Sequence, residues 1–176
     1  AGVLAQLMSD INFFPKPTIA LVQGAAFGGA VGLVACCDIA LATPRASFCL
    51  SEVRIGLIPA VISPYVVAAI GERQARRYFL TAERFKADQA LHFGLIHQVC
   101  DDLDQALSPI VDSLLGNSPA AMTSAKELIQ FVSFENINQQ VISGTTERIA
   151  AIRVSVEGQE GLTAFLDKRT PNWIKE

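Results

Sequence analysis

The stretch GAAFGGAVGLVACCDIAL, residues 24–41, sets three glycines around one aromatic residue and then carries no charge until Asp38. Residues 18–24 before it (TIALVQG) are rich in β-branched and apolar side chains, which is typical of a buried strand. Residues 28–37 predict a short apolar helix, and residues 37–43 (CDIALAT) predict a second strand. The order of strand, glycine-rich turn, helix and strand predicts an α/β fold.

The spacing of the glycines limits which ligands this turn can hold. Gly24, Gly28 and Gly29 match neither the G-x-G-x-x-G pattern of dinucleotide sites nor the G-x-x-x-x-G-K-[ST] pattern of triphosphate sites. At a strand-to-helix turn, the first N–H groups of the helix lack intrahelical partners and the helix dipole is positive. These glycines therefore predict either a site for an oxyanion that develops on a carbonyl, or close packing alone.

Glu52 lies at the end of a third predicted strand, residues 46–53 (ASFCLSEV), among apolar neighbours. Such surroundings disfavour the charged form of a carboxyl group, which suits a group that must carry a proton. The alternatives are an ion pair with Arg54 on one strand face, or simple exposure at the strand end. Asp38 is expected to accept hydrogen bonds from backbone N–H groups, and His97 is expected to be structural or to lie at the surface.

The composition narrows the classes of partner. Of the 176 residues, 51% are hydrophobic and 18% are charged, which predicts deep burial or an apolar surface covered by other subunits. The net charge of −3 without a basic cluster argues against a nucleic-acid partner, and no apolar run is long enough for a membrane span. The four cysteines form no C-x-x-C pair, so we expect free thiols in a cytoplasmic protein and no metal site.

The middle of the chain predicts helices that are separated by glycines. One helix is centred on residues 65–70, breaks at Gly71, and resumes as an amphipathic helix over residues 72–80. A shorter Ala-rich helical segment ends at Gly94, and residues 95–100 (LIHQVC) follow as a strand.

Everything from residue 102 onward is predicted to be helical, including helices over residues 135–154 and 157–166. The predicted organisation is therefore an α/β core over residues 1–116 and a helical oligomerisation region over residues 117–176. Terminal helices that do not fold back on a complete core often dock on a neighbouring subunit, so we expect an oligomer.

Three segments together resemble one family. Residues 16–59 are similar to the K-P strand, glycine turn, helix, C-D-I strand and F-x-x-x-E-x-x-x-G-x-x-P run of the enoyl-CoA hydratase/isomerase family, the crotonases. Residues 72–99 and 155–173 resemble the later motifs of the same family. The resemblance implies a crotonase (ClpP-like) fold of repeated β-β-α units with a C-terminal helical trimerisation region, assembled as homotrimers or hexamers.

The same resemblance implies the substrate and the site. It implies acyl-CoA thioester substrates, and no cofactor other than the CoA that belongs to the substrate. The Gly29 N–H is implied to be one of two oxyanion donors, and Glu52 is implied to move a proton at the α or γ carbon of the substrate. The positions implied to bind substrate, the last of them near the CoA phosphates, are Gly28, Gly32, Ser51, Ala60 and Lys168.

Two departures from the family pattern concern the chemistry. Hydratases of the family carry a second catalytic glutamate three residues after Gly29, where this sequence has Gly32. The family's A-G-x-D loop, which supplies the other oxyanion donor, has no counterpart in the sequence, so we expect the N-terminal part of the enzyme to be missing. Glu52 alone would then have to orient the water and deliver its proton, unless the substrate contributes a group.

The predicted function is the hydration of a 2-enoyl-CoA. Residues 25–65 are most similar to bacterial hydratases of branched glutaconyl-CoA thioesters, 3-methylglutaconyl-CoA of leucine degradation and isohexenylglutaconyl-CoA. Arg54 is a candidate for binding the second carboxylate of such a substrate. One alternative is a Δ3-Δ2 enoyl-CoA isomerase that uses Glu52 alone, and another is a non-catalytic binding protein.

Overall fold

The computed structural model describes residues 1–133 and 135–174, and the packing divides the chain into two compact units. Unit 1 is Ala1–Leu107 and unit 2 is Ser108–Glu176. This division falls earlier in the chain than the boundary at residue 116 that the sequence predicts between core and helical region.

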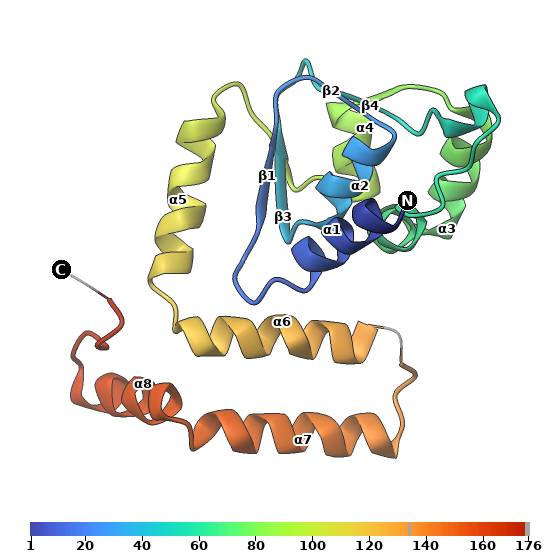
Figure 1. Cartoon of the computed structure of the whole chain (residues 1–176). Helices are drawn as coiled ribbons and strands as arrows, with labels where there is room; N and C mark the ends of the chain where they lie inside the picture. Colours follow the sequence, from blue (N-terminus) through green and yellow to red (C-terminus); the bar gives the residue numbers. More distant parts are fainter. Residues whose placement is uncertain (134, 175–176) are drawn as a thin grey trace. The chain divides into compact units, whose positions relative to one another are not determined.

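Unit 1 contains two small sheets (Figure 1). The strands of the first sheet are β1 (Ile19–Val22), β3 (Ile39–Ala42) and β6 (Gln98–Val99). The strands of the second sheet are β2 (Ala25–Phe27), β4 (Ser47–Cys49) and β5 (Phe85–Lys86). The first sheet is parallel with the order β1-β3-β6, whereas in the second β2 and β4 are parallel and β5 is antiparallel to β4.

The first four strands alternate between the two sheets. β1 and β2 are followed by helix α2 (Gly29–Cys36), and β3 and β4 are followed by helix α3 (Ser63–Thr81). Each repeat gives one strand to each sheet and then a helix, which confirms the predicted β-β-α units. Helix α2 is tolerated in the interior because it carries no charged side chain, and its buried residues are Val31, Gly32, Val34 and Cys36.

Two further helices, α1 (Gly2–Asn12) and α4 (Ala87–Phe93), belong to unit 1. The predicted break at Gly71 is confirmed, since its φ of 74° and ψ of 157° interrupt α3. The predicted end of α4 at Gly94 is confirmed as well, with φ at 85°. Both backbones lie at positive φ, where a residue without a β-carbon is strongly favoured.

The glycine-rich turn contains a strand that the sequence did not predict. β2 pairs in register with β4, so Ala26 lies opposite Phe48, and Ser47 N–H donates to the Gly24 carbonyl at 3.1 Å. Three residues between Gly24 and Gly28 are too few to produce a periodic hydrophobic signal. Strand β2 therefore forms because it pairs with β4, and not because its residues have a high strand propensity.

The prediction of a strand over residues 46–53 is wrong in its second half. The strand ends at Cys49, and Glu52–Ile55 forms the short 3-10 helix η1. Leu57 N–H donates to the Glu52 carbonyl at 3.0 Å, and Gly56 adopts a φ of 75°, so the chain turns back on itself. Glu52 therefore begins a tight turn and does not end a strand.

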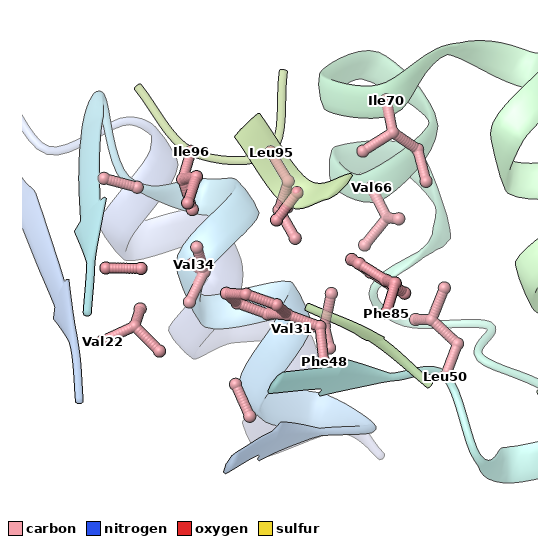
Figure 2. Close-up of a cluster of buried hydrophobic side chains, with 14 of the residues drawn as sticks. Val22, Val31, Val34, Phe48, Leu50, Val66, Ile70, Phe85, Leu95 and Ile96 are labelled. Atoms are coloured by element: carbon pink, nitrogen blue, oxygen red, sulfur yellow. The ribbon is translucent and has the colours of Figure 1, made fainter. Parts of the chain in front are cut away.

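The core of unit 1 is a cluster of buried aliphatic and aromatic side chains (Figure 2). Val31 of α2 lies at its centre, close to Phe48 of β4, and Phe85 of β5 lies beside them. The ring centroids of Phe48 and Phe85 are 5.4 Å apart and those of Tyr78 and Phe85 are 4.7 Å apart. Such aromatic pairs add about 0.5–1.5 kcal/mol each beyond the burial of their area.

Two polar residues support the first sheet, as the sequence predicts. Asp38 Oδ2 accepts hydrogen bonds from the backbone N–H of Thr18 at 2.7 Å and from its hydroxyl at 2.9 Å. His97 Nδ1 accepts the backbone N–H of Ala40 at 3.1 Å. Both side chains bind backbone next to strand ends, which confirms their structural roles.

All four cysteines are free thiols. Cys36 lies buried in α2 with its thiol 3.4 Å from Met8 Sδ, and burial raises its pKa to about 12. A thiol that stays protonated at neutral pH packs as a small apolar group. Within residues 1–133 and 135–174, no three His, Cys, Asp or Glu side chains gather closely enough to hold a metal ion.

Unit 2 is helical, as predicted. Helix α5 (Leu103–Leu115) runs across the boundary, and α6 (Pro119–Ser133), α7 (Gln139–Arg153) and α8 (Val156–Asp167) follow. Asn138 caps α7 by accepting the Val141 N–H at 3.0 Å, so this helix begins later than the predicted residue 135. Ser155 caps α8 in the same way, through the Gly158 N–H.

Unit 2 buries little of its apolar surface. Of the described residues from 108 onward, Ala164 alone is buried, whereas Phe165 is 81% exposed and Val156 is 86% exposed. Among the helices of the described residues, none combines the length and the apolar character needed to cross a bilayer.

Candidate active site

The pairing of β2 with β4 brings the glycine turn and Glu52 together. Phe27 lies opposite Cys49, and the Gly28 N–H donates to the Cys49 carbonyl at 2.8 Å. The chain then leaves β4 and forms η1, whose first residue is Glu52. Two motifs that are more than twenty residues apart in the sequence thus meet at one end of the second sheet.

Gly28 has a backbone conformation and a neighbour that both demand glycine. Its φ of 54° and ψ of −123° lie at positive φ, where other residues are strained. A β-carbon at this position would lie 3.2 Å from Glu52 Oε1, so the carboxylate sits directly over the Gly28 α-carbon. Substitution would strain the turn and push against the carboxylate at once.

Gly29 begins α2, so its N–H has no acceptor within the helix. This N–H also meets no acceptor elsewhere in the part of the chain that the structure describes. The positive end of the helix dipole adds to its capacity to hold negative charge. A carbonyl oxygen that gains charge during a reaction is the chemical group that such a donor stabilises best.

One carboxylate oxygen of Glu52 lacks the hydrogen bond that a buried polar atom normally makes. Its Oε2 is buried and has no hydrogen-bond partner among the described residues. Leaving a buried polar group unpaired costs about 1–3 kcal/mol, and more for a charged group. A buried unpaired group in a native protein calls for an explanation, and a catalytic role is one such explanation.

Arg54 does not pair with Glu52, so the alternative of an ion pair on one strand face is wrong. Its guanidinium donates to the Ala82 carbonyl at the end of α3, and no ion pair between Arg54 and Glu52 forms in the described chain. The Cys49 thiol donates to the same carbonyl at 3.2 Å. Ala82 therefore ties both η1 and the end of β4 to α3.

Gly32 lies where helices approach each other closely. A β-carbon at Gly32 would lie 2.7 Å from Ile62 Cβ, still closer to Ile62 Cγ2, and 3.1 Å from Met8 Cε. Real β-carbons do not approach other atoms closer than about 3.0 Å, so the packing excludes any side chain at this position. The sequence marked Gly32 but not Ile62, because only the folded chain places Ile62 there.

The remaining predicted site residues lie in different places. Ser51 immediately precedes Glu52 and is the N-cap residue of η1. Ala60 is exposed, and its carbonyl accepts the Ser63 hydroxyl at 2.8 Å just before α3 begins. Lys168 is exposed in unit 2 and ends α8 in a left-handed conformation, with φ at 54°. Their roles in substrate binding stay predictions.

The glycine turn at the N-terminus of α2 lies beside an unpaired carboxylate on a β-β-α fold, an arrangement suited to chemistry at a carbonyl group. The sequence model of the family described as enoyl-CoA hydratase/isomerase matches residues 2–176. The solved structure of an enoyl-CoA hydratase from Shewanella pealeana is 61% identical, with a TM-score of 0.95 over 97% of this chain. The chain therefore belongs to the enoyl-CoA hydratase/isomerase family, and its fold is the crotonase fold.

The curated relatives are longer than this chain. The 2,3-dehydroadipyl-CoA hydratase of Escherichia coli (strain K12) is 30% identical over 96% of the chain, and the match covers 67% of that protein. An enoyl-CoA hydratase of Alternaria alternata is 39% identical over 64% of the chain and is matched over 37% of its own length. This chain likewise spans 64% of the Shewanella structure.

Proposed function

We propose that this protein hydrates a 2-enoyl-CoA through a thioester enolate. The observation that carries the proposal is the buried, unpaired Oε2 of Glu52, next to the Gly28 turn and the free N–H of Gly29. A carboxylate without a partner can accept a proton, and an N–H without a partner can hold the oxygen of the enolate.

The proposed reaction uses these two groups in sequence. Glu52 removes a proton from water as its oxygen bonds to the β-carbon, and the π electrons move toward the thioester oxygen. The Gly29 N–H, as one of two donors, stabilises the charge on that oxygen. Glu52 then delivers the proton to the α-carbon, so one water is added across the double bond and the carboxylate is restored.

A second candidate function is the isomerisation of a 3-enoyl-CoA to a 2-enoyl-CoA. The packing of Ile62 against Gly32 favours it, since this packing leaves no room for a second carboxylate at that position. A shift of the double bond needs one base only. Glu52 would remove a proton from the α-carbon and return it to the γ-carbon, with the same enolate held by Gly29.

The proposed substrate class is a branched acyl-CoA with a second carboxylate, of the methylglutaconyl or isohexenylglutaconyl type. Sequence resemblance supports it, and so does the similarity to a relative named for 2,3-dehydroadipyl-CoA, the thioester of a dicarboxylic acid. Arg54 is the proposed partner of the distal carboxylate, because a guanidinium has five N–H donors and not all are used at Ala82.

The proposed assembly is a homotrimer or a hexamer, with no cofactor beyond the CoA of the substrate. The exposed apolar side chains of unit 2 support an interface between copies of the chain. Lys168 is proposed to approach the CoA phosphates.

Two thioesters separate the candidate functions. Crotonyl-CoA loses its enoyl absorbance when it is hydrated, whereas a 3-enoyl-CoA gains that absorbance when it is isomerised to the 2-enoyl form. We expect hydration to be the faster reaction, and Glu52→Gln to lower its kcat by about 10²- to 10⁴-fold. Faster isomerisation would favour the second function. No turnover of either thioester, with Glu52→Gln indistinguishable from the unchanged protein, would favour a non-catalytic binding protein.

A further inference from the structure

Position 32 points toward the same place as Glu52. Gly28 and Gly32 are four residues apart at the start of α2, so they share one face of the helix. Side chains of a helix lean toward its N-terminus and cover the preceding turn. A side chain at position 32 would therefore reach back toward Gly28, where the Glu52 carboxylate lies.

Ile62 fills the space that such a side chain needs. It is 2% exposed and is the residue before α3, and its Cβ would lie 2.7 Å from a β-carbon at position 32. Met8 Cε, the other near atom at 3.1 Å, is the end of a flexible side chain and can move away. Ile62 Cβ is attached directly to the backbone and cannot move without shifting the start of α3.

We propose that Ile62 is a specificity-determining residue that restricts this active site to a single carboxylate. The inference rests on the proposed function, since it concerns which of two reactions the Glu52 site favours. Because Ile62 is apolar and buried, it neither takes a proton nor binds a water beside Glu52. Glu52 must then handle every proton itself.

A second carboxylate would change the two reactions unequally. Hydration needs a group to hold and deprotonate water while a proton reaches the α-carbon, so two carboxylates can divide the work. Isomerisation moves one proton between two carbons of the same substrate and gains nothing from a second base. If Ile62 excludes a second carboxylate, adding one at position 32 should raise the ratio of the hydration rate to the isomerisation rate. A purely structural role of Ile62 would leave this ratio unchanged.

The test opens position 32 and then fills it. Ile62→Gly removes the obstructing Cβ and is compatible with the N-cap position, where glycine is well tolerated. Gly32→Glu/Ile62→Gly is compared with Gly32→Gln/Ile62→Gly, which has the same shape but cannot take up a proton at neutral pH. We expect the ratio of hydration to isomerisation to be about tenfold or more higher in the glutamate variant. Equal ratios in the two variants would overturn the proposal.

Thermal melting tests the steric step independently of activity. We expect Gly32→Ala to lower the melting temperature of the chain, and to lower it much less when Ile62→Gly is already present. Gly24→Ala is the matched control, because a β-carbon at Gly24 meets no atom within 4 Å. Strictly additive shifts would show that Ile62 is not the barrier. If the protein without substitutions turned over neither thioester, the proposed function would be overturned. The melting temperatures would still show whether Ile62 blocks a side chain at position 32.

Discussion

The two units of this chain bury their apolar side chains to very different degrees. In unit 1, Val31, Phe48 and Tyr78 are at most 1% exposed and belong to one buried cluster. In unit 2, among the residues described, Ala164 alone is buried, and Phe165 is 81% exposed. The first unit has a core of its own, whereas the second presents apolar side chains without one.

This difference places the proposed site in unit 1 and the proposed interface in unit 2. The Gly28 turn, Gly29 and Glu52 all belong to unit 1, where close packing can hold them within fractions of an ångström. Unit 2 has helix caps and ion pairs and leaves most of its large apolar side chains exposed, as the proposed interface between copies of the chain would require. Substitutions in unit 1 should therefore lower stability or activity, whereas substitutions of exposed apolar residues in unit 2 should affect assembly.

The largest contrast is expected from one change made in each unit. Phe85 is 1% exposed and packs on Phe48 and Tyr78. Phe85→Ala should lower the free energy of unfolding by about 3–5 kcal/mol because it leaves a cavity in a rigid core. Denaturant unfolding followed by circular dichroism measures this loss.

The matched change in unit 2 is Phe165→Ala. Its side chain is exposed, so the unfolding free energy of the chain should change by less than about 0.5 kcal/mol. The same variant should lower the mass of any oligomer in light scattering, because it removes apolar contact area. Equal losses of stability in both variants, with the assembly unchanged, would contradict the distinction between the units.

A smaller effect is expected at the glycine turn. Gly28→Ala should cost about 1–3 kcal/mol in stability, because an alanine is strained at φ 54°, and should also reduce activity by crowding Glu52. Gly24→Ala is the control, since a β-carbon there meets no atom within 4 Å. Chemical unfolding and rate measurements on both variants decide the point. Similar behaviour of the two glycines would mean that the turn is not specifically built around the carboxylate.

A further test concerns how unit 1 positions Glu52. Arg54 ties η1 to the Ala82 carbonyl, so on crotonyl-CoA, which has no second carboxylate, Arg54→Ala should lower kcat about tenfold with little change in KM, as expected for a misplaced catalytic group. Arg54→Lys should restore part of the rate, because an ammonium group can still donate to one carbonyl. Arg76→Ala, at an exposed ion pair with Glu72, should have no effect. On a dicarboxylic acyl-CoA, the proposed binding of the distal carboxylate predicts a rise in KM as well, and an unchanged KM would remove that role. An unchanged kcat on crotonyl-CoA would show that Arg54 does not position Glu52.

The smallest effect is expected at an ion pair of unit 2. Arg169 donates two hydrogen bonds to Glu160, at 2.6 and 2.8 Å, and Asn172 N–H donates a third, which lowers the pKa of Glu160 from 4.5 to about 2. The stabilisation from this lowered pKa is present above pH 4.5 and is lost as the pH falls toward 2. Arg169→Ala should make helix melting less dependent on pH in that window. If Arg169→Ala left the pH dependence of melting unchanged, that dependence would have to come from other carboxylates.

Local signals in the sequence predicted the parts of the fold that depend on local chemistry. The breaks at Gly71 and Gly94 were predictable because positive φ selects glycine. The proximity of the glycine turn and Glu52 follows from family motifs and is matched by the packing of Glu52 on Gly28. A backbone conformation that is set by a residue and its neighbours in the chain can therefore be predicted from the sequence.

Contacts between distant segments were not predictable where no family motif records them. Strand β2 exists because it pairs with β4, Arg54 finds Ala82 instead of Glu52, and Ile62 packs on Gly32. Each depends on where another segment lies in space, which short-range patterns do not encode. The absent side chain at Gly32 was visible in the sequence, but the residue that requires its absence was not.

Glu52 is proposed to move a proton at the α-carbon of a thioester whose oxygen is held by the Gly29 N–H. The most direct measurement is the exchange of α-hydrogens of butyryl-CoA in D₂O, followed by mass spectrometry, because this exchange requires the enolate but neither hydration nor isomerisation. We expect steady uptake of deuterium with the unchanged protein, and uptake slower by about 10²-fold or more with Glu52→Gln. Equal uptake with both proteins would contradict it.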